Sequence, residues 1–149
     1  MRLDLTQLIK SQGISKDINY SLDLSNLELF GYYPFKKPII VEGSVYNICG
    51  ALVIKATANA IFDGLCDRCQ KEFSMPVSVE FESNIALKET GDVGQDTIIT
   101  NNGMLEVDDI IKENLILSIP MKLLCKDDCK GLCYICGNDL NDKKCNCIS

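Results

Sequence analysis

The sequence predicts an α+β protein, in which a mainly antiparallel, partly closed β meander is covered by one helix and followed by a cysteine-rich C-terminal segment. Three observations predict this fold class. Apolar and polar residues alternate in three successive segments, as they do in half-buried strands. One later segment has apolar residues at helical spacing. Six of the nine cysteines lie within the last 25 residues.

The N-terminal part predicts one short helix and one strand. Thr6 is a candidate N-cap for a helix over residues 6–12, which Gly13 would end. Residues 18–24 alternate apolar and polar side chains, as in a strand. Residues 25–38 are expected to form a loop-rich connection.

The centre of the chain predicts three strands joined by short turns. Residues 39–48 have a mixed but strand-like pattern, and Gly50 allows a turn into residues 51–62. Residues 73–87 show the longest alternation. Together the three segments predict an antiparallel meander with one buried face. The residues expected on that face are Leu52, Ile54, Ala56, Ala58, Ala60, Phe62, Phe73, Met75, Val77, Val79, Phe81, Ile85 and Leu87.

The last third predicts a connection, a helix and an appendage within one domain of residues 1–149. Residues 88–102 contain glycines among acids and are expected to form a mobile connection. A helix follows and ends before Pro120, with Asp108 and Asp109 suited to its positive N-terminal end. Residues 125–147 form the cysteine-rich tail. One helical face carries Val107, Ile110, Ile111, Leu115 and Ser118.

Composition excludes several classes of function. The chain of 149 residues has a net charge of −6 and no histidine, so Ser-His and Cys-His nucleophile pairs and the H-E-x-x-H metalloprotease helix are excluded. The acidic excess lies in residues 82–120, which makes unaided non-specific nucleic-acid binding unfavourable. No apolar stretch is long enough to span a membrane, and we expect a cytoplasmic protein. Cysteine richness then indicates metal or redox chemistry.

The first cysteine motif is Cys66-x-x-Cys69, in the turn between the two clearest strands. Such a turn directs two sulfurs at one metal ion. Three interpretations remain open: half of a zinc site, a dithiol redox pair, or two thiols packed in a turn. Redox chemistry is the weakest of them, because dithiol enzymes usually place this motif at a helix N-terminus.

The second motif predicts a structural zinc site in the tail. Cys133-Tyr134-Ile135-Cys136-Gly137 has the form of a zinc knuckle, in which two thiolates bracket a tight turn. Two further ligands are available from Cys125 or Cys129 upstream and from Cys145 or Cys147 downstream. The tail has too few large apolar residues to fold alone, so a metal would supply the missing free energy.

Counting the thiols suggests a larger arrangement. The six tail cysteines and the pair at Cys66 and Cys69 make eight, enough for one or two structural zinc ions, and two sites would pin the tail to the sheet. Cys49 would then be left over as a small buried residue on its strand. Iron suits a tetrahedral four-sulfur site as well as zinc.

Three stretches together resemble the YceD-like family of large ribosomal RNA subunit accumulation proteins from bacteria and plastids. They are Cys66-Asp67-Arg68-Cys69-Gln70-Lys71-Glu72-Phe73, then Glu113-Asn114-Leu115-Ile116-Leu117-Ser118-Ile119-Pro120, then the tail from Cys129-Lys130-Gly131-Leu132-Cys133 through Cys145-Asn146-Cys147. The resemblance covers the chain from about Ile39 to its end. Tyr134 stands at a position where many members of the family have proline. Some members lack the tail cysteines altogether.

The resemblance implies a non-catalytic accessory protein that promotes accumulation or processing of large-subunit ribosomal RNA, with the metal as scaffold. Expected partners are the precursor RNA, a basic ribosomal protein, or both, without a membrane or a small-molecule substrate. Arg68 is the first candidate for contact with RNA or a partner, and Lys71 and Lys130 are weaker ones. In the alternative interpretation Arg68 only stabilises its turn. The acidic residues 88–109 suit a basic partner.

A second function remains open. The protein could instead be a zinc- or thiol-based redox-responsive regulator, in which oxidation of the tail releases metal. Enzymatic carboxylate chemistry is the least favoured class, because no spacing places two acids in one cleft.

Overall fold

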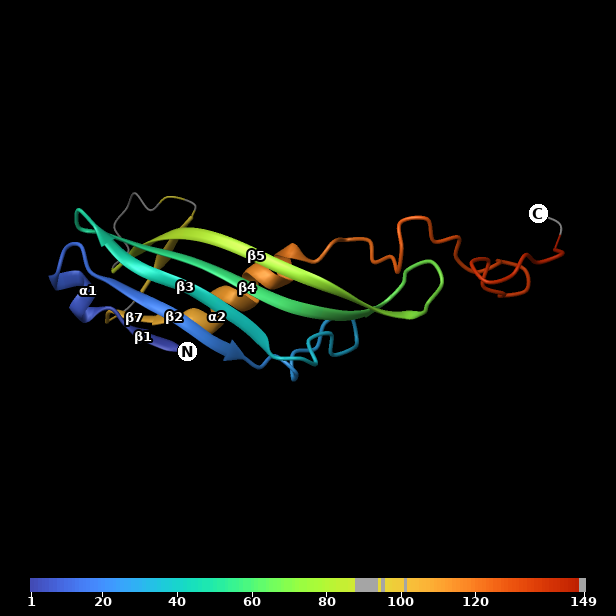
Figure 1. Ribbon diagram of the computed structural model, residues 1–149, viewed down its shortest axis with the longest axis horizontal. Coiled ribbons are helices and arrows are strands. Elements are labelled where there is room, and N and C mark those ends of the chain that lie inside the picture. The colour runs from blue at the N-terminus through green and yellow to red at the C-terminus, as the bar shows by residue number, and fades with distance from the viewer. Residues whose placement is uncertain (88–93, 95, 101, 148–149) are drawn as a thin grey trace.

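The computed structural model describes residues 1–87, 94, 96–100 and 102–147, and its main feature is a long antiparallel sheet (Figure 1). Four strands are neighbours both along the chain and in the sheet: β2 (Ser15–Leu22), β3 (Ile39–Ile48), β4 (Ala51–Leu65) and β5 (Glu72–Ala86). A further strand, β6 (Thr97–Ile99), pairs parallel to β5. The predicted meander is confirmed, and the strand expected over residues 18–24 is its first member.

A two-residue turn joins β3 to β4. Ile48 pairs with Ala51, and the residues between them, Cys49 and Gly50, have φ angles of 52° and 89°. Two left-handed residues are typical of the hairpin turn that matches the twist of the flanking strands. Cys49 is exposed. The prediction that it is buried on a strand is therefore wrong, because β3 ends one residue earlier and the turn directs this side chain outward.

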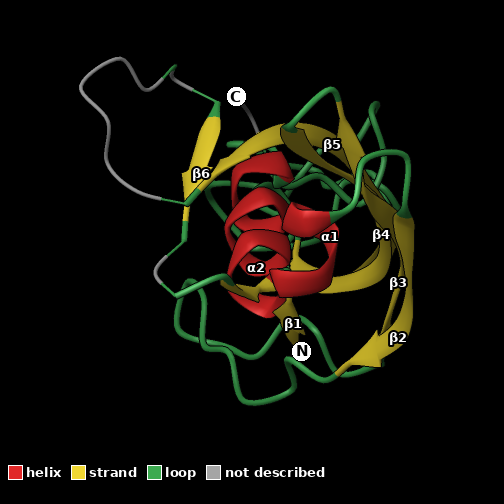
Figure 2. Ribbon diagram, turned by 90° about the vertical axis from the view of Figure 1, so that its left-hand side faces the viewer, coloured by secondary structure: helices red, strands yellow, loops and turns green. Residues whose placement is uncertain are grey.

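The centre of the core is β4 and the helix that covers it. Every apolar even-numbered residue predicted for β4 is buried. The sheet curls around α2 (Val107–Ser118), as Figure 2 shows. Val107, Ile111 and Leu115 of this helix are buried, which confirms the predicted helix. Ser118, also expected on the buried face, is exposed, and its hydroxyl donates to the carbonyl of Leu115 at 2.7 Å.

The N-terminus forms a small second sheet that the sequence did not predict. β1 (Arg2–Asp4) pairs antiparallel with β7 (Met104–Glu106). Helix α1 (Thr6–Lys10) is shorter than the predicted segment, and Thr6 is its first helical residue and not its cap. The Thr6 hydroxyl donates instead to the Asp4 carboxylate at 2.5 Å. Strands of three residues are too short to produce a periodic pattern.

The predicted connection over residues 88–102 falls partly outside the described structure. Residues 88–93, 95 and 101 are not described. Within the remainder, Thr97–Ile99 forms β6, so this part of the chain contains a strand that the sequence analysis missed. Across the described residues, no helix is both long and apolar enough to cross a membrane.

The two longest strands extend beyond the rest of the sheet. β3 pairs with β4 only as far as Asn59, whereas β4 and β5 remain paired to Leu65 and Glu72. We call residues 60–65 and 72–77 the hairpin extension. It reaches the end of the molecule where the cysteine-rich segment lies (Figure 1). From here on, the tail means residues 121–147, which adds the residues between Pro120 and Cys125 to that segment. The described tail has neither helix nor strand, and an isolated bridge joins Leu132 to Asp139.

Candidate metal centres

The hairpin extension ends in a tight turn that carries two buried thiols. The Cys66 N–H donates to the Lys71 carbonyl, and the Gln70 N–H donates to the Cys66 carbonyl, both at 2.9 Å. Cys66 is fully buried and Cys69 is 4% exposed, although the turn lies at one end of the molecule. Residues of the tail cover them.

Two tail cysteines complete a first thiol group, which consists of Cys66, Cys69, Cys125 and Cys129. The four sulfur atoms lie within 4.8 Å of one another. The Cys66 and Cys129 sulfurs are 3.7 Å apart, and those of Cys69 and Cys125 are 3.6 Å apart. A tetrahedral site with metal–sulfur bonds of about 2.3 Å has sulfur–sulfur edges of about 3.8 Å. The donor set and its spacing therefore fit one tetrahedral metal ion.

Electrostatics also favour a cation in this group. Burial raises the pKa of Cys66, but the backbone N–H groups of Cys69, Cys125 and Arg68 outweigh it and lower that pKa to about 6. Burial, with the neighbouring thiols, raises the pKa of Cys125 to about 12. Without a metal, the first group thus favours a thiolate at Cys66 and disfavours a second thiolate at Cys125. Because metal coordination deprotonates thiols outright, a bound cation allows all four to carry charge.

Polar contacts hold the tail against the turn. The Asp67 N–H donates to the Leu123 carbonyl, and the Leu123 N–H donates to the Asp67 carboxylate, both at 2.7 Å. The Arg68 guanidinium donates to the Cys129 carbonyl at 2.7 Å. The Leu132 N–H donates to the Arg68 carbonyl at 3.2 Å. These contacts position the tail thiols opposite those of the turn.

Lys71 links the turn to the far part of the tail. Its ammonium nitrogen lies 2.7 Å from carboxylate oxygens of both Asp139 and Asp142. The hydrogen bond from Lys71 is the main reason why the pKa of Asp139 is lowered to about 2. The two acids in turn raise the pKa of Lys71. A single exposed ion pair contributes little to stability, but one cation shared by two acids holds residues 139–142 against the hairpin turn.

The second thiol group lies wholly within the tail. Its four sulfurs, from Cys133, Cys136, Cys145 and Cys147, also lie within 4.8 Å of one another. Gly137 has a φ of 73°, and its N–H donates to the Cys133 carbonyl at 2.8 Å, which closes the predicted knuckle turn. Hydrogen bonds from the backbone of this turn lower the pKa of Cys133 to about 6. The Cys136 thiol is the main reason why the pKa of Cys147 rises to about 12.

The eight predicted ligands thus divide into two groups of four. The sequence left open which tail cysteines complete the knuckle. In the structure Cys145 and Cys147 do so, whereas Cys125 and Cys129 both lie with the hairpin thiols. Two groups are the larger of the arrangements that the count of thiols suggested, and the first of them joins the tail to the sheet. Each group could hold one metal ion.

The three predicted RNA- or partner-binding cations lie beside these groups. The guanidinium of Arg68 and the ammonium of Lys71 make the contacts with the tail described above. Lys130 is exposed, and its backbone N–H donates to the side-chain oxygen of Asn141 at 2.9 Å. The contact of Arg68 has the form expected when it stabilises its turn, and the prediction that it meets RNA stays a prediction.

Sequence reasoning missed the polar residues that follow the knuckle. The Asn141 side-chain amide donates to the Cys129 sulfur at 3.4 Å and so links the segment after the knuckle to the first group. The Asn141 backbone N–H donates to the Asp139 carboxylate at 2.9 Å. This bond between residues two apart is an Asx turn. The order Asp139-Leu140-Asn141 is compatible with such a turn, so the sequence could have predicted it.

The two groups differ in accessibility, and this predicts an order of modification. Cys66, Cys69 and Cys129 are buried, whereas Cys136 is exposed and Cys145 and Cys147 are partly exposed. With limiting maleimide, mass spectrometry should find Cys49 labelled first, the second group next and the first group last. Equal labelling of both groups would contradict this order. Disulfides formed in the second group at low peroxide doses would support the redox-regulator alternative.

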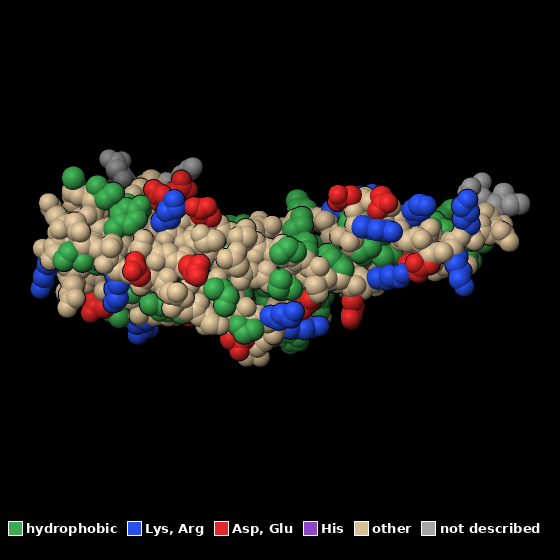
Figure 3. All heavy atoms as spheres, in the orientation of Figure 1, with side chains coloured by type: hydrophobic (Ala, Val, Ile, Leu, Met, Phe, Trp, Pro, Cys, Tyr) green, Lys and Arg blue, Asp and Glu red, His purple; other side chains and the backbone are tan. Residues whose placement is uncertain are grey.

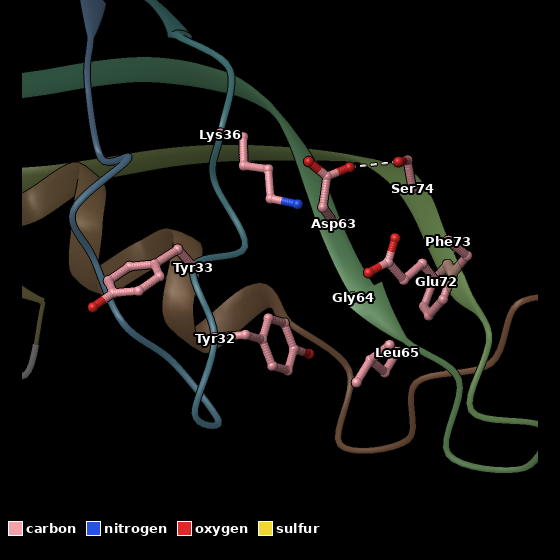
Figure 4. Close-up of a pocket in the computed structure, with 9 residues that line it drawn as sticks. All are labelled: Tyr32, Tyr33, Lys36, Asp63, Gly64, Leu65, Glu72, Phe73 and Ser74. Carbon is pink, nitrogen blue, oxygen red and sulfur yellow. Dashed lines mark hydrogen bonds between the residues drawn. The ribbon is translucent and has the colours of Figure 1, made fainter.

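A hollow of about 440 Å³ beside the hairpin extension is a further candidate site (Figure 4). The carboxylates of Asp63 and Glu72 line it, and Lys36 points toward Asp63. A Cβ atom at Gly64 would come within 2.5 Å of the Phe62 ring, so this wall requires glycine. One cation against two acids leaves little net charge to select an ionic ligand. The two thiol groups are the stronger candidates.

Comparison with models of protein families identifies a match. The family model described as "Large ribosomal RNA subunit accumulation protein YceD" matches residues 54–149, well over half of the chain. No curated protein and no solved structure matched the chain significantly. The matched region contains β5, α2 and all eight thiols of the two groups.

Proposed function

The chain belongs to the YceD family of large ribosomal RNA subunit accumulation proteins, and from this premise we propose that it is a non-catalytic accessory factor of large-subunit assembly. It acts in the cytoplasm on particles that contain precursor large-subunit RNA. The observation that carries the proposal is the family match over residues 54–149.

The two thiol groups serve this function as scaffold, with zinc as their metal. Four thiolates leave no open coordination position for a substrate, which is the arrangement of structural zinc sites. Cys66, Cys69, Cys125 and Cys129 would hold the tail on the hairpin extension, and the second group would hold the tail in its own fold. A bound zinc ion supplies the folding free energy that this tail, with few buried apolar residues, does not have.

An acidic hollow supports contact with a basic ribosomal protein. A space of about 800 Å³ beside β6, β7 and α2 is lined by Asp96, Glu106, Asp109 and Glu113. Arg2 pairs with Glu106 at its edge. The remaining carboxylates form a negative surface that attracts lysine-rich segments and speeds their association.

The experiment that tests the proposal is depletion of the protein, followed by sucrose-gradient analysis of ribosomal particles. Precursor and mature large-subunit RNA are quantified in each fraction. We expect a selective loss of large subunits or accumulation of their precursors, restored by expression of the wild-type chain. An unchanged profile after complete depletion would contradict the proposed function.

A further inference from the structure

The tip of the tail exposes apolar side chains in the turn that carries two cysteines of the second thiol group. Tyr134 is 80% exposed and Ile135 is 54% exposed, and both lie between Cys133 and Cys136. Leu132, just before the turn, is 40% exposed. Exposed apolar residues that are gathered in one place indicate a contact surface.

The backbone beneath Tyr134 is well ordered by local bonds. The Cys133 N–H donates to the Asn138 carbonyl, and the Gly137 N–H donates to the Cys133 carbonyl, both at 2.8 Å. The Leu140 N–H donates to the Gly131 carbonyl at 2.9 Å. A tyrosine on such a turn has only two side-chain torsions to restrict on binding, so its ring makes contact with little loss of entropy.

Exposed lysines lie in the same small thiol module as this ring. Lys130, Lys143 and Lys144 are exposed, and the Lys143-Lys144 pair directly precedes Cys145 of the same thiol group. The two nearby acids, Asp139 and Asp142, are both engaged by Lys71. Figure 3 shows Lys and Arg side chains gathered on the end of the molecule that the tail forms. An exposed aromatic ring and exposed lysines on one module match the chemistry of an unpaired nucleotide, which presents a base to stack and a phosphate to neutralise.

We propose that Tyr134 is a stacking platform for an unpaired base of single-stranded RNA, with Lys130, Lys143 and Lys144 contacting its phosphates. This inference rests on the proposed function and names the place where the RNA is held. A four-residue turn is too small for a stable protein interface, which needs about 800 Å² on each partner, so the surface favours RNA over protein. A metal ion with four thiolates carries a net charge of about −2, and stacking therefore contributes more than phosphate attraction.

The test measures binding of a fluorescein-labelled oligouridine to the metal-loaded full chain by fluorescence anisotropy. Replacing Tyr134→Ala should weaken affinity about 10-fold, because it removes one stacked base. Tyr134→Phe keeps the ring and should bind like the wild type. Tyr33→Ala, at an aromatic residue of the loop 25–38 that is 50% exposed, is the matched control and should leave affinity unchanged. The affinity should decrease only weakly as the salt concentration rises, because at most three lysines contact phosphates.

Crosslinking keeps the inference falsifiable if Tyr134→Ala disturbs the tail. Native mass spectrometry reports the metal content of each variant. With the unmodified protein, an oligomer containing 4-thiouridine should crosslink to Tyr134 or its neighbours in the turn. Wild-type affinity in a metal-loaded Tyr134→Ala variant, or crosslinks that map only elsewhere, would overturn the inference.

Complementation of depleted cells separates this inference from the proposed function. If depletion reduces large subunits and Tyr134→Ala restores them fully with undiminished RNA affinity, the inference fails and the proposed function stands. If depletion leaves large subunits unchanged, the proposed function fails whatever the RNA affinity. If the Tyr134→Ala variant restores large subunits poorly but binds RNA normally, the tip of the tail contacts another macromolecule. The inference that Tyr134 stacks on RNA is then overturned.

Discussion

Replacing Cys66 and Cys69 together with serine is expected to leave one metal ion per chain, against the two expected for the wild type, and to release the tail from the hairpin extension. The first thiol group contains two cysteines of the hairpin turn. Without them, the two tail cysteines that remain are too few for a site of four thiolates. The second group uses residues of the tail only and should keep its metal. Native mass spectrometry counts the ions directly.

The free energy involved is large, because structural zinc contributes on the order of 10 kcal/mol to folding of the segment that binds it. Without the first site, the tail retains only hydrogen bonds such as those of Asp67 and Arg68 to hold it. Hydrogen exchange should therefore show loss of protection at the Asp67 and Leu132 amides. Protection in the centre of β4 should persist, because that strand is buried under α2.

The matched control is Cys49→Ser. Cys49 is exposed in the turn between β3 and β4 and belongs to neither thiol group. Its replacement should leave two metal ions and unchanged protection. Two ions retained by the Cys66→Ser, Cys69→Ser double variant would show that the hairpin thiols are not ligands.

The second large effect is expected from Phe62→Ala in the core. The Phe62 ring is fully buried and packs edge-on against Phe35 and Tyr32, with ring centroids 5.9 Å and 6.5 Å away. Truncation of such a ring leaves a cavity and should lower the free energy of unfolding by about 3–5 kcal/mol. Urea unfolding followed by circular dichroism measures this loss.

Phe30→Ala provides the comparison for that variant. Phe30 also lies near Tyr32, with ring centroids 6.3 Å apart, but it is 68% exposed. Its truncation should change the free energy of unfolding by about 0.5 kcal/mol or less. Similar losses for the two phenylalanines would mean that Phe62 does not join the sheet to the loop of residues 25–38.

The parts of the fold that were predictable are those governed by local periodicity. The alternation of residues 51–62 identified β4 and its buried face, because a strand half-buried under a helix must alternate. The spacing of Val107, Ile111 and Leu115 identified α2, because a helix with one buried face repeats its apolar residues every three or four positions. By contrast β1, β6 and β7 exist only through their partners, and strands of three residues leave no periodic signal.

The grouping of the thiols required the tertiary structure. Spacing identified the knuckle of Cys133 and Cys136 as a ligand pair, but spacing has no information on whether Cys125 lies near residue 66 or residue 145. The contacts of Asp67 with Leu123 decide this, and they join residues 56 positions apart. Cys49 was misplaced because strand patterns do not report where a strand ends.

The first thiol group also constrains the order in which the chain folds. It joins Cys66 to Cys129, which are separated by 63 positions that include β5 and α2. Closing a loop of that length in an unfolded chain is unfavourable by about 4 kcal/mol, whereas the β4–β5 hairpin closes through local pairing. Assembly of the first thiol group is therefore a late step, after hairpin formation. During synthesis strands β2 to β5 can pair before Cys129 leaves the ribosome. The tail cysteines then join Cys66 and Cys69 at the end of a hairpin that has already formed.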